Sequence, residues 1–157
     1  MTSRTQGELD IVLVPASADD LPGIEALLSG SQLPTTDVAQ HLGGFILARA
    51  EGELVGTGAL EWYGEVALLR SVCVAPSHRS HRVGRALLDA IESDATSQGI
   101  HHLYLLTTTA ADYFARHGFE TITRDQAPAA IQQTAEFRTL CPSSAVCMQK
   151  ALGLDVS

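Results

Sequence analysis

One segment, residues 71–88, constrains what this chain can fold into more than any other. It opens with alternating apolar residues that predict a β-strand stopped at Pro76, and it continues as a polar loop. An apolar stripe at helical spacing begins at Val83, so the loop leads directly into a helix. The start of a helix offers unpaired backbone N–H groups and the positive end of the helix dipole. The segment therefore predicts an anion-binding site.

The charge balance of the whole chain makes this loop unusual. Among 157 residues, 10 are Lys or Arg and 18 are Asp or Glu, which gives a formal net charge of −8. This balance argues against nucleic-acid binding, which needs a basic surface, and requires any anion to be held locally. Arg79, Arg82 and Arg85 nevertheless gather in the loop. A solvated basic loop is the alternative, but three arginines at one helix start favour a phosphate group.

The rest of the chain has the patterning of one mixed α/β domain, residues 1–157, with a loose tail at 151–157. Helical spacing and capping residues predict helices at 17–30, 83–98, 109–118 and 125–138, and a short one between 35 and 44. Apolar runs bounded by turn residues predict strands at 10–15, 45–50, 54–62, 66–74, 102–107 and 145–149.

The cysteines and the apolar runs indicate where such a protein works. Cys73, Cys141 and Cys147 are odd in number and fit no zinc spacing, so we interpret them as reduced thiols and predict no metal site. No apolar run approaches the ~20 residues of a membrane span. Residues 1–10 lack the apolar core of a secretory signal. We therefore expect a cytoplasmic protein that binds neither membranes nor nucleic acid.

Two motifs resemble those of the GNAT superfamily of acyl-CoA N-acyltransferases. Residues 72–76 (V-C-V-A-P) and 79–84 (R-S-H-R-V-G) resemble the family's V-x-V-x-P strand and R-x-x-G-x-G/A loop. Residues 113–119 (Y-F-A-R-H-G-F) resemble its aromatic pair before Gly-Phe. The two motifs follow in the family's order and spacing. The resemblance implies an α/β (α+β) fold with a central mixed, mostly antiparallel twisted sheet of six to seven strands and helices on both faces.

The resemblance also implies acetyl-CoA as co-substrate, without a metal. The pantetheine arm would pair with the strand like an added strand, and the diphosphate would sit at the helix start. The residues that it assigns to the cofactor are Val72, Cys73, Val74, Arg79, Ser80, His81, Arg82, Val83, Gly84 and Arg85. Arg82 departs from the family, because it replaces the first loop glycine. If residue 82 is already helical, an arginine is tolerated there and could contact phosphate; otherwise it marks weakened cofactor binding.

Catalysis needs a neutral amine, a stabilised oxyanion and a departing thiolate. By residue type and proximity to the central strands, the candidate bases are Glu61, Glu65 and His41. Many family members have a tyrosine where this chain has Phe114, and that tyrosine protonates the thiolate. Tyr113 is the nearest hydroxyl, although on a helix it points about 100° away. The simplest oxyanion donor is a backbone N–H on the strand at 72–74.

Arg70 is the most informative candidate for acceptor binding. Strict alternation would bury it beside Leu68 and Val72, where an unpaired charge is costly. A β-bulge between Arg70 and Val72 would turn it outward to bind a substrate carboxylate or oxyanion. The alternative is an ion pair with Glu61 or Glu65. The hydroxyl groups at the end of the next predicted strand would complete the acceptor pocket: Thr107, Thr108 and Thr109. The alternative is that they cap the following helix.

Residues 105–119 also resemble the acetyltransferase domain of N-acetylglutamate synthases. Together with residues 137–148, they resemble still more closely the small GNAT proteins of bacterial arsenic-resistance gene clusters. Both resemblances imply direct acetyl transfer to the amine of a small amino-acid-like acceptor. The sequence leaves the oligomeric state open, with a homodimer as one alternative. Two other functions stay open too. Arg82 and Phe114 suggest a CoA-binding regulatory module without catalysis, and Cys141 with Cys147 an arsenic-resistance role.

Overall fold

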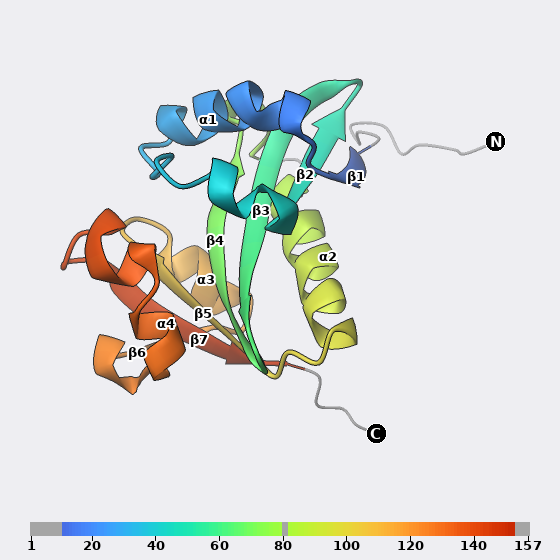
Figure 1. Ribbon diagram of the computed structural model, residues 1–157. Helices are drawn as coiled ribbons and strands as arrows, with labels where there is room; N and C mark the ends of the chain where they lie inside the picture. The colour runs from blue at the N-terminus through green and yellow to red at the C-terminus, as the bar shows by residue number, and fades with distance from the viewer. Residues whose placement is uncertain (1–10, 80–81, 153–157) are drawn as a thin grey trace. The chain divides into compact units, whose positions relative to one another are not determined.

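The computed structural model describes residues 11–79 and 82–152 (Figure 1). Within these residues the strands form a seven-stranded sheet with the hydrogen-bonded order β1-β2-β3-β4-β5-β7-β6. The β4–β5 pair is parallel, whereas the β1–β2, β2–β3, β5–β7 and β6–β7 pairs are antiparallel. The strands are β1 Ile11–Pro15, β2 Phe45–Ala50, β3 Glu53–Tyr63, β4 Val66–Val74, β5 His102–Thr107, β6 Glu120–Ile122 and β7 Val146–Ala151.

Four α-helices lie in the described residues: α1 Leu21–Gly30, α2 Val83–Ser97, α3 Ala111–Arg116 and α4 Ala129–Gln132. Short 3-10 turns occupy Ala18–Asp20, Ala39–Gly44, Pro76–His78 and Arg124–Gln126, and a π-helical turn occupies Glu136–Leu140. None of these helices combines the length and the apolar content that crossing a membrane requires. The mixed, mostly antiparallel sheet predicted from the sequence is confirmed.

The expected helix at 125–138 is wrong, and Pro128 supplies the reason. A residue before proline is driven out of the helical region, and Ala127 is extended, with φ −75° and ψ 151°. Helix α4 therefore begins only after Pro128, and the later residues form the separate π-helical turn. Strand β6 was not predicted, because three residues are too few to show a period of two. The expected loose tail at 151–157 is partly wrong as well, since Ala151 closes β7; residues 153–157 lie outside the described part.

The described chain divides into two compact units, and strands β3 and β4 and helix α2 contribute residues to both. The first unit comprises Met1–Ala59 and Ser71–Ile91, and the second comprises Leu60–Arg70 and Glu92–Ser157. The expectation of one domain over 1–157 stays a prediction. Each unit has its own cluster of buried apolar side chains, which is described separately.

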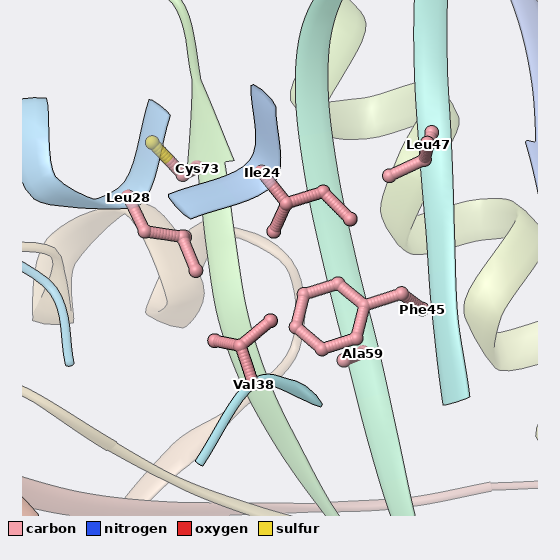
Figure 2. Packing of buried hydrophobic residues seen from close by; sticks show 7 residues of the cluster. All are labelled: Ile24, Leu28, Val38, Phe45, Leu47, Ala59 and Cys73. Atoms are coloured by element: carbon pink, nitrogen blue, oxygen red, sulfur yellow. The ribbon is translucent and has the colours of Figure 1, made fainter. Parts of the chain in front are cut away.

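In the first unit, helices cover both faces of the strands. Because successive strand residues point to opposite faces, Leu47 of β2 packs with Ile24 and Leu28 of α1, while Ala48 packs with the start of α2. Figure 2 shows the α1 side, with the Phe45 ring among the other members of the cluster. Burying such side chains contributes about 1.5–3 kcal/mol each. These two packed layers hold β4 and the start of α2.

Helix α2 approaches β3 where two glycines, Gly56 and Gly58, replace side chains. A Cβ on Gly56 would lie 2.8 Å from Leu87 Cδ1 and 2.9 Å from Val83 Cγ1. A Cβ on Gly58 would lie 2.5 Å from Ile91 Cδ1. These separations are shorter than van der Waals contact. The two glycines therefore set how closely the first turns of α2 pack against the sheet.

In the second unit, the core lies where β4, β5 and β7 meet the irregular segment after β6. Its buried members are Leu68, Tyr104, Ala127, Ile131, Phe137 and Cys147. Arg124 fastens this segment, because its Nη1 donates to the Phe137 carbonyl at 3.0 Å and its Nη2 donates to the Pro142 carbonyl. Its guanidinium also lies 5.9 Å from the centre of the Phe137 ring. Side-chain contacts of this kind hold a segment that has little regular structure.

We predict that Gly56→Ala destabilises the protein by about 1–3 kcal/mol, the usual cost of overpacking a buried site. The added methyl group must push Leu87 and Val83 of α2 away from β3. Urea unfolding measures the change. Gly30→Ala in α1 is the matched control, because a Cβ there meets nothing within 4 Å. Equal unfolding midpoints for Gly56→Ala and the unaltered protein would contradict the close packing of α2.

Candidate functional site

Strand β4 carries an irregular residue in the segment predicted to bind the cofactor. Ser71 has φ 58°, in the left-handed region that L-residues seldom adopt. Its carbonyl oxygen accepts a hydrogen bond from Oγ1 of Thr57 on β3 at 2.7 Å. Beyond it, the Ala75 N–H donates to the Val55 carbonyl at 2.8 Å. The irregularity lies between Arg70 and Val72, where the sequence predicts a β-bulge.

The end of β4 is tied to the end of α1 by Arg79. Its Nε donates to the Val74 carbonyl at 3.0 Å, and its Nη2 donates to Ser31 Oγ at 3.2 Å. Ser31 Oγ also accepts from Cys73 Sγ at 3.1 Å. Cys73 is 5% exposed and packs with the α1 cluster, so only its backbone is available to a cofactor. The contacts of Arg79 use two of the five N–H donors of a guanidinium.

Arg82 begins helix α2 in a conformation that explains a family glycine. It has φ 62°, and its carbonyl accepts the Ala86 N–H at 3.1 Å, as the first carbonyl of a helix does. Residue 82 is therefore not right-handed helical, which was the condition for tolerating an arginine, and the alternative of weakened cofactor binding stays a prediction. A left-handed arginine costs roughly 1–2 kcal/mol, which glycine avoids. The predicted cofactor residues Ser80 and His81 lie outside the described residues.

The remaining cofactor candidates divide into buried and exposed side chains. Val83 is fully buried against β3, so it anchors the first turn of α2. Arg85 is 70% exposed and its Nε lies 3.9 Å from Asp89 Oδ2. An exposed pair of this kind contributes little to stability. The Arg85 guanidinium is therefore accessible to an anion near the start of α2.

Arg70 lies at the centre of a buried charged cluster in the second unit. Its Nη1 is 2.6 Å from Glu61 Oε2, and its Nε is 3.4 Å from Glu136 Oε2. The Arg70 side chain is 0% exposed, so the expectation that a bulge turns it outward is wrong. Tyr63 donates its hydroxyl to Glu61 Oε1 at 2.5 Å. The structure thus shows the ion pair with Glu61 that the sequence leaves as an alternative.

The three candidate bases differ in their hydrogen-bond and ion-pair partners. Both oxygens of Glu61 accept hydrogen bonds, which orients this candidate base firmly. Glu65 is exposed in the turn before β4, seven residues ahead of Val72. His41 Nε2 lies 3.6 Å from Asp37 Oδ2 in the first unit. The roles of all three as bases stay predictions.

Glu136 is the member of the charged cluster that sequence reasoning missed. It is 4% exposed and lies in the π-helical turn, 66 positions after Arg70. The available signal was that a buried Arg70 requires carboxylate partners. The predicted regular helix at 125–138 gave no reason to choose Glu136 among the acidic residues of the chain.

The aromatic motif and the threonines lie around α3. Phe114 is buried with its ring 5.6 Å from that of Phe119, so it packs in the interior. Tyr113 is half-buried, and its ring lies 4.6 Å from that of His117. Thr107 Oγ1 accepts the Ala110 N–H at 3.0 Å, a hydrogen bond of the turn before α3 and not a cap of that helix, whose N-cap is Ala110. Exposed residues Thr108 and Thr109 follow it, and their role in acceptor binding stays a prediction.

Two free thiols in the second unit have raised pKa values. Burial, with the nearby Glu136 carboxylate, raises the pKa of Cys141 to about 12. Burial raises the pKa of Cys147 to about 11, against an opposing effect of Arg124. Both thiols are therefore protonated at neutral pH, whereas a soft metal or metalloid binds the thiolate. A metal or metalloid bound by the pair would therefore have to displace a proton from each thiol.

The family is shown by comparison with known proteins. The model of the acetyltransferase (GNAT) domain matches residues 41–121, just over half of the chain. The chain therefore belongs to the GNAT family of N-acetyltransferases, as its motifs predict.

Its curated relatives differ in length. An uncharacterized N-acetyltransferase of Chlorobaculum tepidum is 26% identical over 117 residues, 74% of this chain and 73% of that protein. The amino-acid acetyltransferase of Neisseria meningitidis is 30% identical over 122 residues, which cover 72% of this chain and 28% of that protein. The chain thus spans little more than a quarter of the amino-acid acetyltransferase that it matches.

Solved structures share the fold. The N-acetylglutamate synthase of Neisseria gonorrhoeae, in complex with coenzyme A and N-acetylglutamate, has a TM-score of 0.80 at 22% identity, over 94% of this chain and 36% of that one. A Mycobacterium tuberculosis protein in complex with CoA has a TM-score of 0.76 at 24% identity, over 90% of this chain and 99% of that one. At these identities the likeness shows the fold alone.

We predict that Arg70→Met lowers the free energy of unfolding by about 3–5 kcal/mol, because it leaves two buried carboxylates without their cation. The triple variant Glu61→Gln, Arg70→Met, Glu136→Gln removes all three charges and is expected to recover most of that loss. Chemical unfolding of both variants measures the difference. A triple variant no more stable than Arg70→Met alone would show that the charges do not act as a unit.

Proposed function

We propose that this protein transfers an acetyl group from acetyl-CoA directly to the amine of a small amino-acid-like acceptor. The observation that carries the proposal is the irregular strand end at Ser71–Val74, followed by a left-handed Arg82 and the start of α2. An extended arm can pair with a strand, and a diphosphate suits the start of a helix. Family membership supports both assignments.

The residues in the first unit fit such a cofactor. Backbone groups of Val72 and Val74 would hold the pantetheine arm, and the first N–H groups of α2, including that of Gly84, would hold the diphosphate. Arg79, Arg82 and Arg85 add positive charge around that helix start. Bound acetyl-CoA supplies an activated thioester. The chain's task is then to position an amine, remove its proton and stabilise the oxyanion.

The acceptor class follows from Arg70 and from the relatives. The amino-acid acetyltransferases and the N-acetylglutamate synthase are named for amino-acid substrates, which carry a carboxylate beside the amine. In this chain Arg70 already contacts two internal carboxylates, and the contact with Glu136 is the longer one. We propose that an acceptor carboxylate takes the place of Glu136 on Arg70. Thr108 and Thr109 are retained as further candidates for the acceptor pocket.

Two roles in proton transfer remain assigned by residue type. Glu61 is the preferred base of the three candidates, because its carboxylate is oriented by Tyr63 and Arg70. Tyr113 is the candidate acid for the leaving thiolate, because Phe114 has no proton to give and is buried. Since its three cysteines are free, we also propose that the protein works in the cytoplasm, where thiols stay reduced.

A CoA-binding module without catalysis is the second candidate function. The strained Arg82 and the buried Phe114, which stand where the family has a glycine and a tyrosine, favour it. Release of free thiol from acetyl-CoA in the presence of a broad amine panel separates the two functions. Cofactor binding without thiol release from any amine would favour the regulatory module.

We predict that acetyl-CoA raises the melting temperature. A ligand at 100 times its Kd stabilises by about 2.7 kcal/mol, or several degrees for a protein of this size. Gly84→Leu is expected to abolish the shift, because a bulky side chain crowds the helix start. Gly43→Leu serves as a control away from the loop, since a Cβ there meets nothing within 4 Å. No shift for the unaltered protein at millimolar acetyl-CoA would contradict the proposed function.

We also predict that Glu136→Gln changes the acceptor preference. Removing the competing charge should lower KM for amino acids roughly tenfold, which corresponds to about 1.4 kcal/mol. KM for the matching amino-acid amides, which lack the carboxylate, should stay unchanged. Glu120→Gln, an exposed residue of β6, is the control. An equal change of KM for acids and amides would show that Glu136 does not compete for Arg70.

A further inference from the structure

Thr57 carries a polar group at a fully buried position in the first unit. It is 0% exposed and lies between Gly56 and Gly58 on β3, opposite Leu47 of β2. Burying a hydroxyl without a hydrogen-bond partner destabilises a protein. A valine has the same shape and avoids that cost. The hydroxyl group is therefore retained for its hydrogen bond.

The partner is the carbonyl oxygen of Ser71, the left-handed residue of β4. Thr57 Oγ1 donates to it at 2.7 Å, the usual length of an O–H···O hydrogen bond. A non-glycine residue at φ 58° is strained and persists only where its surroundings enforce it. The Thr57 hydroxyl is a contact that enforces this conformation, since it captures the carbonyl that the unusual φ exposes.

This hydrogen bond also fixes the next N–H group along the chain. The described backbone contains no cis peptide, so the Ser71 C=O and the Val72 N–H point in opposite directions across one planar unit. With the carbonyl held toward Thr57 on β3, the Val72 N–H is directed away from it. Val72 belongs to the strand segment that we propose to hold the cofactor.

We infer that Thr57 is a positioning residue for acetyl transfer, acting through the Ser71–Val72 peptide to aim the Val72 N–H at the thioester oxygen. The inference rests on the proposed function. Attack of the amine moves an electron pair from the C=O bond onto that oxygen, and an aimed N–H stabilises the charge. The C–S bond then breaks, the thiolate leaves with its electron pair, and the amine proton passes to a base. Thr57 touches neither substrate.

The experiment compares Thr57→Val, which keeps the shape and loses the donor, with Thr57→Ser, which keeps the donor. Removing an oxyanion donor costs roughly 100- to 1000-fold in kcat, so we expect Thr57→Val to lower kcat by about 10- to 100-fold with KM for acetyl-CoA little changed. Thr57→Ser should stay within about threefold of the unaltered protein. Unfolding curves establish that each variant is folded at the assay temperature.

A second measurement needs no acceptor. The aimed N–H contacts the acetyl oxygen, so Thr57→Val should reduce the preference for acetyl-CoA over CoA in calorimetric binding, whereas a purely structural loss weakens both equally. Thr57→Cys, a weaker donor, should fall between serine and valine in kcat if the valine variant does not fold.

A folded Thr57→Val with unaltered kcat and unaltered acetyl-CoA preference would overturn the inference, as would a loss confined to stability. If the unaltered protein transfers no acetyl group, the proposed function itself is contradicted, and the role inferred for Thr57 falls with it.

Discussion

The buried guanidinium of Arg70 is the constraint on which the second unit depends. A charge with 0% exposure is stable only beside opposite charges, and the chain provides Glu61 from β3 and Glu136 from the π-helical turn. Tyr63 and Cys141 then satisfy the outer oxygens of those carboxylates. Two strands and an otherwise irregular segment are thereby joined through one side chain. The displacement of Glu136 by an acceptor carboxylate, as proposed above, would act on this same cluster.

Regular elements were predictable because their residues repeat the period of the structure. The alternation in β2, β3 and β4 and the stripe on α2 determine which side chains face the two helical layers of the first unit. The segment after β6 does not follow from periodicity. Its path depends on Pro128, on the hydrogen bonds that Arg124 donates to two carbonyl groups, and on the ion pair between Glu136 and Arg70. Contacts distant in sequence decide that path, and no local pattern encodes them.

The site was predictable in its chemistry and less so in its backbone. The motif residues 72–84 indicate a cofactor strand and an anion loop, and the GNAT family is confirmed. Sequence letters do not reveal that Ser71 and Arg82 both have left-handed φ values. In both places the conformation is one that glycine favours, and the chain uses a bulkier residue. Tertiary contacts, such as the hydroxyl of Thr57 at the first of them, make such choices possible.

The two glycines of β3 have a consequence for the start of α2. Because Val83 and Leu87 occupy the space beside Gly56, the absence of a Cβ at this residue determines how closely α2 packs against the sheet. The backbone N–H groups proposed to meet a diphosphate belong to that same first turn. We therefore expect a change of side-chain volume at Gly56 to alter the affinity for the proposed cofactor as well as the stability of the fold.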